Sequence, residues 1–141
     1  MFIIKELIIC LIITIVIEYI PIVIFLQIPK KYFIAVNVLT NVVANIIVLI
    51  YDLLGIKNLG IISRSQVFIV LETIVCAVEI FLYYEYIKMK KLHRINNSQI
   101  IENKDSSFIN AIEVVKIVVL TIFANVTSFI IGTKILLINF I

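Results

Sequence analysis

Four long apolar runs constrain the fold of this chain more than any other feature of its sequence. They cover about residues 7–28, 32–54, 67–87 and 114–137. A bilayer has a hydrocarbon core about 30 Å thick, which takes roughly 20 residues of helix to cross. Backbone polar groups find no water inside lipid, so runs of this kind cross it as helices. The sequence predicts an all-α polytopic membrane protein, with four transmembrane helices in an antiparallel bundle and residues 1–141 forming one membrane domain.

The composition excludes several other classes of protein. Apolar residues make up 63% of the chain and charged residues 15%, against roughly 45–50% and about 25% in soluble domains. The mean hydropathy is +1.22. A soluble domain of this size has too little interior to hide so much apolar surface, so a soluble enzyme and a nucleic-acid-binding protein are excluded. Cys10 and Cys76 lie within apolar runs and are expected to pack as small hydrophobic side chains; no metal and no cofactor is expected.

The connections between the runs predict the orientation of the bundle. The first is short enough to force an antiparallel hairpin, and the third, about residues 88–110, is the only sizeable polar stretch and is predicted to be a loop. These two connections carry seven Lys and Arg, against four on the opposite side: Lys30, Lys31, Lys88, Lys90, Lys91, Arg94 and Lys104. Because basic loops stay in the cytoplasm, we expect a cytoplasmic membrane, a cytoplasmic 88–110 loop and both termini outside.

Two smaller expectations concern the third connection. Its basic residues Lys88, Lys90, Lys91 and Arg94 are candidates for binding anionic lipid or a cytoplasmic partner. At its far end, Ser107 and Asn110 are typical capping residues and are expected to begin the fourth helix.

The order of polar residues suggests a duplicated helical hairpin. Glu18 lies twelve residues before Lys30, and Glu79 lies twelve residues before Lys91. Each hairpin then continues into a helix with an Asn-Val pair at mid-depth, 41–42 and 125–126. Two helices per unit would give a parallel repeat about an axis along the membrane normal. Chance agreement in so Ile- and Val-rich a chain is the alternative.

Three glutamates, Glu18, Glu72 and Glu79, lie within the apolar runs. An ionisable group at mid-bilayer costs from about 3 to over 10 kcal/mol, so each needs a reason to be there. Glu72 and Glu79 share a helical stripe with Cys76 and Tyr83. The second and fourth helices carry polar stripes of their own, which include Asn37, Thr40, Asn41, Asn45, Thr121, Asn125 and Ser128. We therefore expect the acids and amides to meet at the centre of the bundle.

No Lys, Arg or His lies at the depth of these glutamates. They are then either protonated at neutral pH or gathered around a cation. Pro21 frees the carbonyl of Ile17 beside Glu18, which either helps to form an ion site or only kinks the helix. In a purely structural interpretation Glu18 pairs with Asn41 or Asn45, and Glu79 pairs with Asn125.

Tyrosines gather near the basic end of the predicted bundle. Tyr32, Tyr83, Tyr84 and Tyr86 are expected to form an interfacial belt.

The ordered motifs resemble those of a group of small four-span prokaryotic membrane proteins. They are Ile17-Glu18-Tyr19-Ile20-Pro21, Leu39-Thr40-Asn41, the glutamates of the third run, and Asn125-Val126-Thr127-Ser128-Phe129. In that group the helices carry Glu-x-x-Pro, Leu-Thr-Asn, a glutamate and Asn-x-x-Ser-Phe. A proline often follows Leu-Thr-Asn there, and Val42 stands at that position here. The resemblance implies the topology and the choice of polar residues but no reaction.

Three classes of function remain open. The first is a small transporter or transporter subunit, monomeric, homodimeric or within a larger membrane complex, in which Glu18, Glu72 and Glu79 bind protons or a cation. The second is an accessory or scaffold protein with a structural Glu/Asn core. The third, an intramembrane enzyme, is disfavoured because the runs contain no His and no metal-binding motif, which leaves only a carboxylate pair for chemistry.

Overall fold

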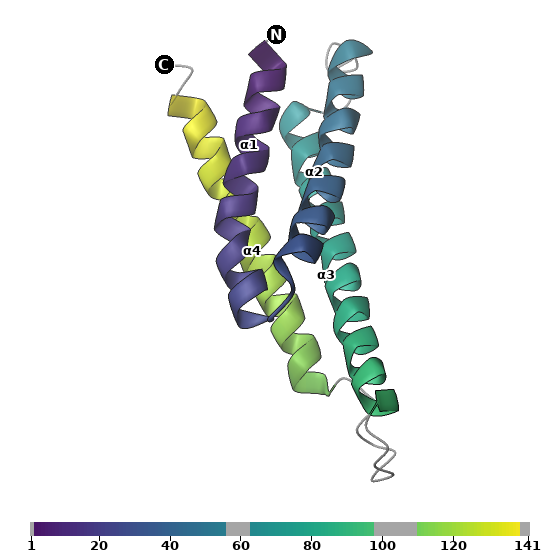
Figure 1. Ribbon diagram of the computed structural model, residues 1–141. Coiled ribbons are helices and arrows are strands. Elements are labelled where there is room, and N and C mark those ends of the chain that lie inside the picture. Colours follow the sequence, from purple (N-terminus) through teal and green to yellow (C-terminus); the bar gives the residue numbers. More distant parts are fainter. Residues whose placement is uncertain (1, 56–62, 98–109, 139–141) are drawn as a thin grey trace.

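The computed structural model describes residues 2–55, 63–97 and 110–138 of the chain. They form α1 (Phe2–Tyr19), η1 (Ile20–Phe25), α2 (Lys30–Leu53), α3 (Arg64–Asn97) and α4 (Ala111–Ile138), with no strand in the described part of the chain. Helix α1 runs beside α4, and α2 runs beside α3, with α3 also packed on α4 (Figure 1). The predicted all-α bundle is confirmed.

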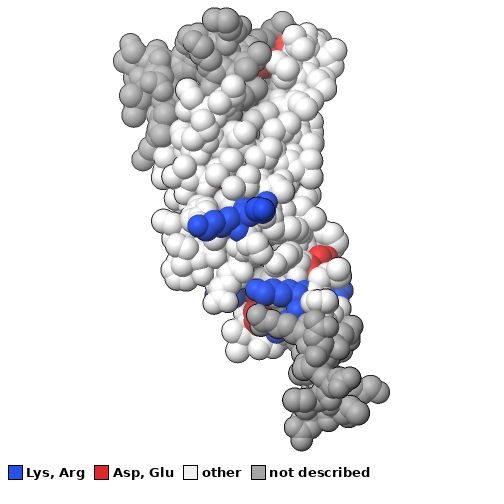
Figure 2. All heavy atoms as spheres, viewed as in Figure 1, with Lys and Arg blue, Asp and Glu red and all other residues white. Residues whose placement is uncertain are grey.

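Within the described residues, three helices are long and apolar enough to cross a membrane. These segments are Lys30–Leu53, Ser65–His93 and Ala111–Gly132, and a shorter apolar helix covers Leu11–Phe25. Large apolar side chains face outwards along the bundle, among them Val16 at 65% exposed, Leu39 at 62% and Phe123 at 63%. In Figure 2 the described surface is mostly uncharged, and the basic side chains lie in two bands in its middle and lower parts. These features fit an integral membrane protein.

The first helix departs from the predicted continuous span over 7–28. Pro21 has no N–H to complete the α-helical bond to the carbonyl of Ile17, and the chain continues as one stretch of π-helix, η1. The turn that follows contains Gln27 in the left-handed conformation, at φ 55°. Pro29 then precedes the first residue of α2. The hairpin is therefore closed by residues 26–29, earlier than the apolar pattern indicates.

The third helix is longer than predicted. It runs through Asn97, so Lys88, Lys90, Lys91 and Arg94 lie on a helix and the prediction of a loop from residue 88 is wrong. The segment contains neither glycine nor proline, and Lys, Met, Leu and Arg all favour helix. Residues 98–109, which include Lys104 and Ser107, lie outside the described residues.

Local capping explains where α3 and α4 begin. Ser63 and Gln66 form a capping box, in which the Ser63 backbone N–H donates to Gln66 Oε1 at 2.8 Å. Asn110 Oδ1 accepts from the backbone N–H of Glu113 at 2.9 Å, as its predicted capping role requires. Lys91 of α3 forms an ion pair with Glu113, which joins the two helices near this end.

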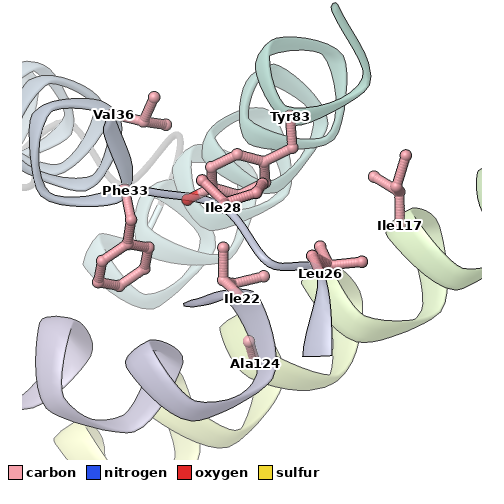
Figure 3. Packing of buried hydrophobic residues seen from close by; sticks show 8 residues of the cluster. All are labelled: Ile22, Leu26, Ile28, Phe33, Val36, Tyr83, Ile117 and Ala124. Atoms are coloured by element: carbon pink, nitrogen blue, oxygen red, sulfur yellow. The ribbon is translucent and has the colours of Figure 1, made fainter. Parts of the chain in front are cut away.

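An apolar cluster packs around the turn between η1 and α2. Figure 3 shows Ile22 of η1 and Leu26 and Ile28 of the turn facing residues of α2, α3 and α4. The other members are Phe33, Val36, Tyr83, Ile117 and Ala124. Because η1, α2, α3 and α4 all contribute, this cluster fixes how η1 and the start of α2 lie against α3 and α4.

Candidate functional site

Two of the three predicted glutamates lie at the centre of the bundle. Glu18 stands one residue before the end of α1, next to η1, and Glu79 lies in the middle of α3. Both side chains are 0% exposed. π-Helical segments occur frequently at functional sites. The π-helix η1 begins at Ile20, two residues after Glu18.

Glu18 joins three helices through its two carboxyl oxygens. Asn37 Nδ2 of α2 donates to Oε2 at 3.0 Å. Ser128 Oγ of α4 lies 2.9 Å from Oε1 and donates to it. The carboxyl group of α1 is thus held between α2 and α4.

Glu79 repeats this arrangement from α3. Thr40 Oγ1 of α2 donates to Oε1 at 2.9 Å, and Asn125 Nδ2 of α4 donates to Oε2 at 2.9 Å. The carboxyl group of α3 is also held between α2 and α4, and each acid receives one amide and one hydroxyl.

Further polar groups contact Asn37, the residue that donates to Glu18. Asn41 Nδ2 donates to the backbone carbonyl of Asn37 at 2.9 Å and approaches Asn37 Oδ1 at 3.3 Å. Asn37 Nδ2 also lies 3.5 Å from the Tyr83 hydroxyl, a long contact. Tyr83 is 0% exposed, so its predicted place in an interfacial belt is wrong. Its position one helical turn after Glu79 could have indicated this, because i and i+4 share a face.

The predicted partner of Glu18, Asn41 or Asn45, is wrong, because Asn37 donates to its carboxyl group instead. Glu18 lies seven residues before Phe25, the end of η1, and Asn37 lies seven residues after Lys30, the start of α2. Both therefore lie the same number of residues from the turn, on opposite sides of it, and their side chains meet. Asn41 is one turn deeper, and Asn45, which is half-buried, is deeper still. The predicted pair of Glu79 with Asn125 is present.

Glu72 does not join the hydrogen bonds made by Glu18 and Glu79. It is half-buried on α3, two turns and about 10 Å along the helix from Glu79. Glu72 and Glu79 both interact electrostatically with Glu18. The structure thus gathers Glu18, Glu79, Asn37, Thr40, Asn125 and Ser128, with Asn41 behind them, and leaves Glu72 and Asn45 aside.

The four side chains that donate to the two carboxyl groups are all neutral. The ion pairs Lys88–Glu85 and Lys91–Glu113 lie elsewhere. The described residues also contain no group of three or more His, Cys, Asp or Glu arranged to hold a metal. What the arrangement offers chemically is two enclosed carboxyl groups that can gain or lose a proton among neutral hydrogen-bonding partners.

One neighbouring polar atom lacks a partner. The hydroxyl oxygen of Thr121 is buried and makes no hydrogen bond within the described residues. The backbone carbonyl of the same residue accepts from Asn125 Nδ2 at 3.1 Å. Thr121 thus continues the polar stripe of α4 one turn beyond Asn125, as the sequence predicts.

Comparison with family models, with curated proteins and with solved structures found no match to this chain.

Proposed function

We propose that this protein is a small proton-coupled membrane transporter, or a subunit of one, in which Glu18 and Glu79 bind and release protons. One observation carries the proposal: two carboxyl groups with 0% exposure share the centre of an apolar bundle and receive hydrogen bonds from neutral side chains alone. An inorganic or organic cation bound between the acids is the alternative ligand, because no basic side chain at this depth supplies the counter-charge.

The choice of residue type supports a role beyond packing. Asparagines, a serine and a threonine already hydrogen-bond across the helices here. Amides at positions 18 and 79 would complete such a network without the desolvation cost of an acid, which is several kcal/mol for an ionised group in lipid. A carboxyl group adds one property that an amide lacks, which is exchange of a proton with its surroundings.

The proposed orientation places the basic end of α3 in the cytoplasm. Lys88, Lys90 and Lys91 then lie where anionic headgroups gather, and each such residue adds about 1 kcal/mol of attraction to the surface. We propose external termini on the same grounds, and a prokaryotic cytoplasmic membrane because the motifs resemble those of small four-span prokaryotic membrane proteins. A second copy of the chain, or a larger membrane complex, is the proposed setting if transport requires more than one bundle.

Proton-coupled transport can be tested in liposomes that contain the purified full chain and a trapped pH dye. A pH gradient, acid inside, is imposed, and sodium, potassium or tetraphenylphosphonium is added outside as a probe. We expect one of these probes to accelerate alkalinisation of the lumen, and Glu18→Gln and Glu79→Gln to abolish that acceleration. Glu72→Gln serves as the matched control and is expected to retain part of it, because Glu72 lies outside the paired site. Equal rates for the wild type and both variants would reject coupling through these acids.

A scaffold role is the second candidate, and the complete hydrogen bonding of both carboxyl groups favours it. Every carboxyl oxygen of Glu18 and Glu79 has a donor within 3.0 Å, which a static core would also have. In that case Glu→Gln at both positions leaves function intact, whereas reversing the charges of Lys88 and Lys90 releases a partner that co-purifies with the chain.

A further inference from the structure

The hydrogen bonds reveal a repeat that is shifted by one helical turn from the predicted one, in which Asn41 corresponds to Asn125. Residues 37–40 read Asn-Val-Leu-Thr, and residues 125–128 read Asn-Val-Thr-Ser. In both, the asparagine donates to the glutamate of its own hairpin, Asn37 to Glu18 and Asn125 to Glu79. The repeated unit is therefore Asn-Val-x-Thr/Ser, with 37 equivalent to 125 rather than 41 equivalent to 125.

The hydroxyl residues of the repeat are exchanged between the two hairpins. Thr40, from the first hairpin, donates to Glu79 of the second, and Ser128, from the second, donates to Glu18 of the first. Because the same exchange occurs in both directions, the two acid sites are related by an approximate two-fold operation. Each acid thus depends on its own hairpin for the amide and on the other hairpin for the hydroxyl.

The amide and the hydroxyl differ in what they can do for an acid. An asparagine Nδ2 only donates, whereas a hydroxyl has one hydrogen to donate and lone pairs that accept. Thr40 Oγ1 lies 2.9 Å from Glu79 Oε1 and also 3.0 Å from the carbonyl of Val36. Ser128 Oγ lies 2.9 Å from Glu18 Oε1 and 2.9 Å from the carbonyl of Asn125. Thr40 Oγ1 also lies 3.2 Å from the carbonyl of Asn37. Each hydroxyl thus has a single hydrogen and, within reach, both a carboxyl oxygen and at least one helix carbonyl.

We infer that Thr40 and Ser128 are positioning residues that let Glu79 and Glu18, respectively, change protonation state without any heavy atom moving. The inference rests on the proposed function in that it requires the acids to exchange protons. With the acid ionised, the hydroxyl hydrogen points to the carboxylate. When a hydronium ion gives a proton to that oxygen and becomes water, the carboxyl O–H donates to the hydroxyl oxygen, and the hydroxyl hydrogen turns to the helix carbonyl. Loss of the proton to water reverses both changes, so the hydroxyl stays neutral throughout.

The titratable surroundings of the two acids come from α1 and α3. Glu18 interacts electrostatically with Glu79 and Glu72, and Tyr83 and Cys76 face the same acids. The side chains that α2 and α4 present to the acids, from Asn37, Thr40, Asn125 and Ser128, do not titrate. A change in the titration of one acid on removal of a hydroxyl therefore reports the lost hydroxyl rather than a lost charge.

Infrared difference spectroscopy of the full chain in lipid nanodiscs tests this assignment. The carboxyl C=O band is followed as pH is changed, and Glu18→Gln and Glu79→Gln assign its components. We expect Thr40→Val to change the band position and the proton affinity of Glu79, by about three- to twentyfold in affinity, and to change Glu18 less, only through its electrostatic interaction with Glu79. Ser128→Ala is expected to change Glu18 most and Glu79 less, for the same reason. Thr40→Ser and Ser128→Thr keep the hydroxyl and should behave as the wild type.

Thr127→Val is the matched control, because this hydroxyl lies inside the repeat but donates to the carbonyl of Phe123 at 2.7 Å. If Thr40→Val does not fold, Thr40→Ala replaces it. The inference is overturned alone if the wild type titrates but the hydroxyl variants change neither acid, or if each changes the acid of its own hairpin more than the acid of the other hairpin. If neither acid titrates in the wild-type protein, the proposed function is overturned as well.

Discussion

Asn37 and Glu18 form the contact whose thermodynamic weight follows most directly from the structure. Asn37→Leu keeps the side chain close in size but removes the donor 3.0 Å from Glu18 Oε2. Leaving that buried acceptor without a partner costs about 1–3 kcal/mol. The bond itself is worth less, about 0.6 kcal/mol on average and up to about 1.7 between helices in a membrane. A double-mutant cycle with Glu18→Leu separates the two quantities.

The cycle is measured by unfolding the purified chain with increasing sodium dodecyl sulfate in mixed micelles. We expect Asn37→Leu to lower the free energy of unfolding by about 1–3 kcal/mol and to couple to Glu18→Leu by about 0.6–1.7 kcal/mol. The control cycle combines Asn37→Leu with Glu79→Leu, whose carboxyl group is bonded by Thr40 and Asn125 instead. Effects in that cycle should add within about 0.5 kcal/mol. Equal coupling in both cycles would refute the pairing described here.

Three other predictions concern the turn, the helix caps and the basic end of α3. Gln27→Gly should raise the free energy of unfolding by up to about 1 kcal/mol, since relief of the left-handed backbone at φ 55° outweighs the added entropy of the unfolded chain; a lower value in the same micelle assay would contradict this. Asn110→Ala should lower it by about 1 kcal/mol, because the N–H of Glu113 loses its acceptor, and Asn110→Asp should restore it. Lys88→Gln with Lys90→Gln should reduce retention of anionic phospholipid in native mass spectrometry, by about 1 kcal/mol of binding per lysine, and equal retention would exclude this lipid contact.

The helices and the polar centre were predictable because both follow from local patterns. Apolar runs of membrane length define α2, α3 and α4, and the cost of an acid in lipid directs Glu18 and Glu79 inwards. The helical spacing of Asn37 and Thr40 places both on the face that meets these acids. None of these steps requires knowledge of how one helix is positioned along another.

The pairing of particular residues was less predictable because it depends on the position of the turn. The apolar pattern places the first hairpin turn two to three residues later than the structure does, since η1 ends at Phe25 and α2 begins at Lys30. A turn placed too late by some number of residues shifts the expected pairing across the hairpin by twice that number. The expected partner of Glu18 therefore moved from Asn37 to Asn41. The end of α3 was not predictable from charge for another reason. Residues 88–97 are strongly basic, which suggests a loop, yet they contain good helix formers and no helix breaker.

The dependence of both acids on α4 has a consequence for biogenesis. Ribosomes produce the chain from its N-terminus, so α4 emerges after α1, α2 and α3, and it brings Asn125 and Ser128, one donor for each glutamate. Until then the nascent first three helices carry two acids with unmet bonding capacity in lipid. Full hydrogen bonding of both acids therefore waits for α4, so any product truncated before α4 would remain exposed to quality-control proteolysis.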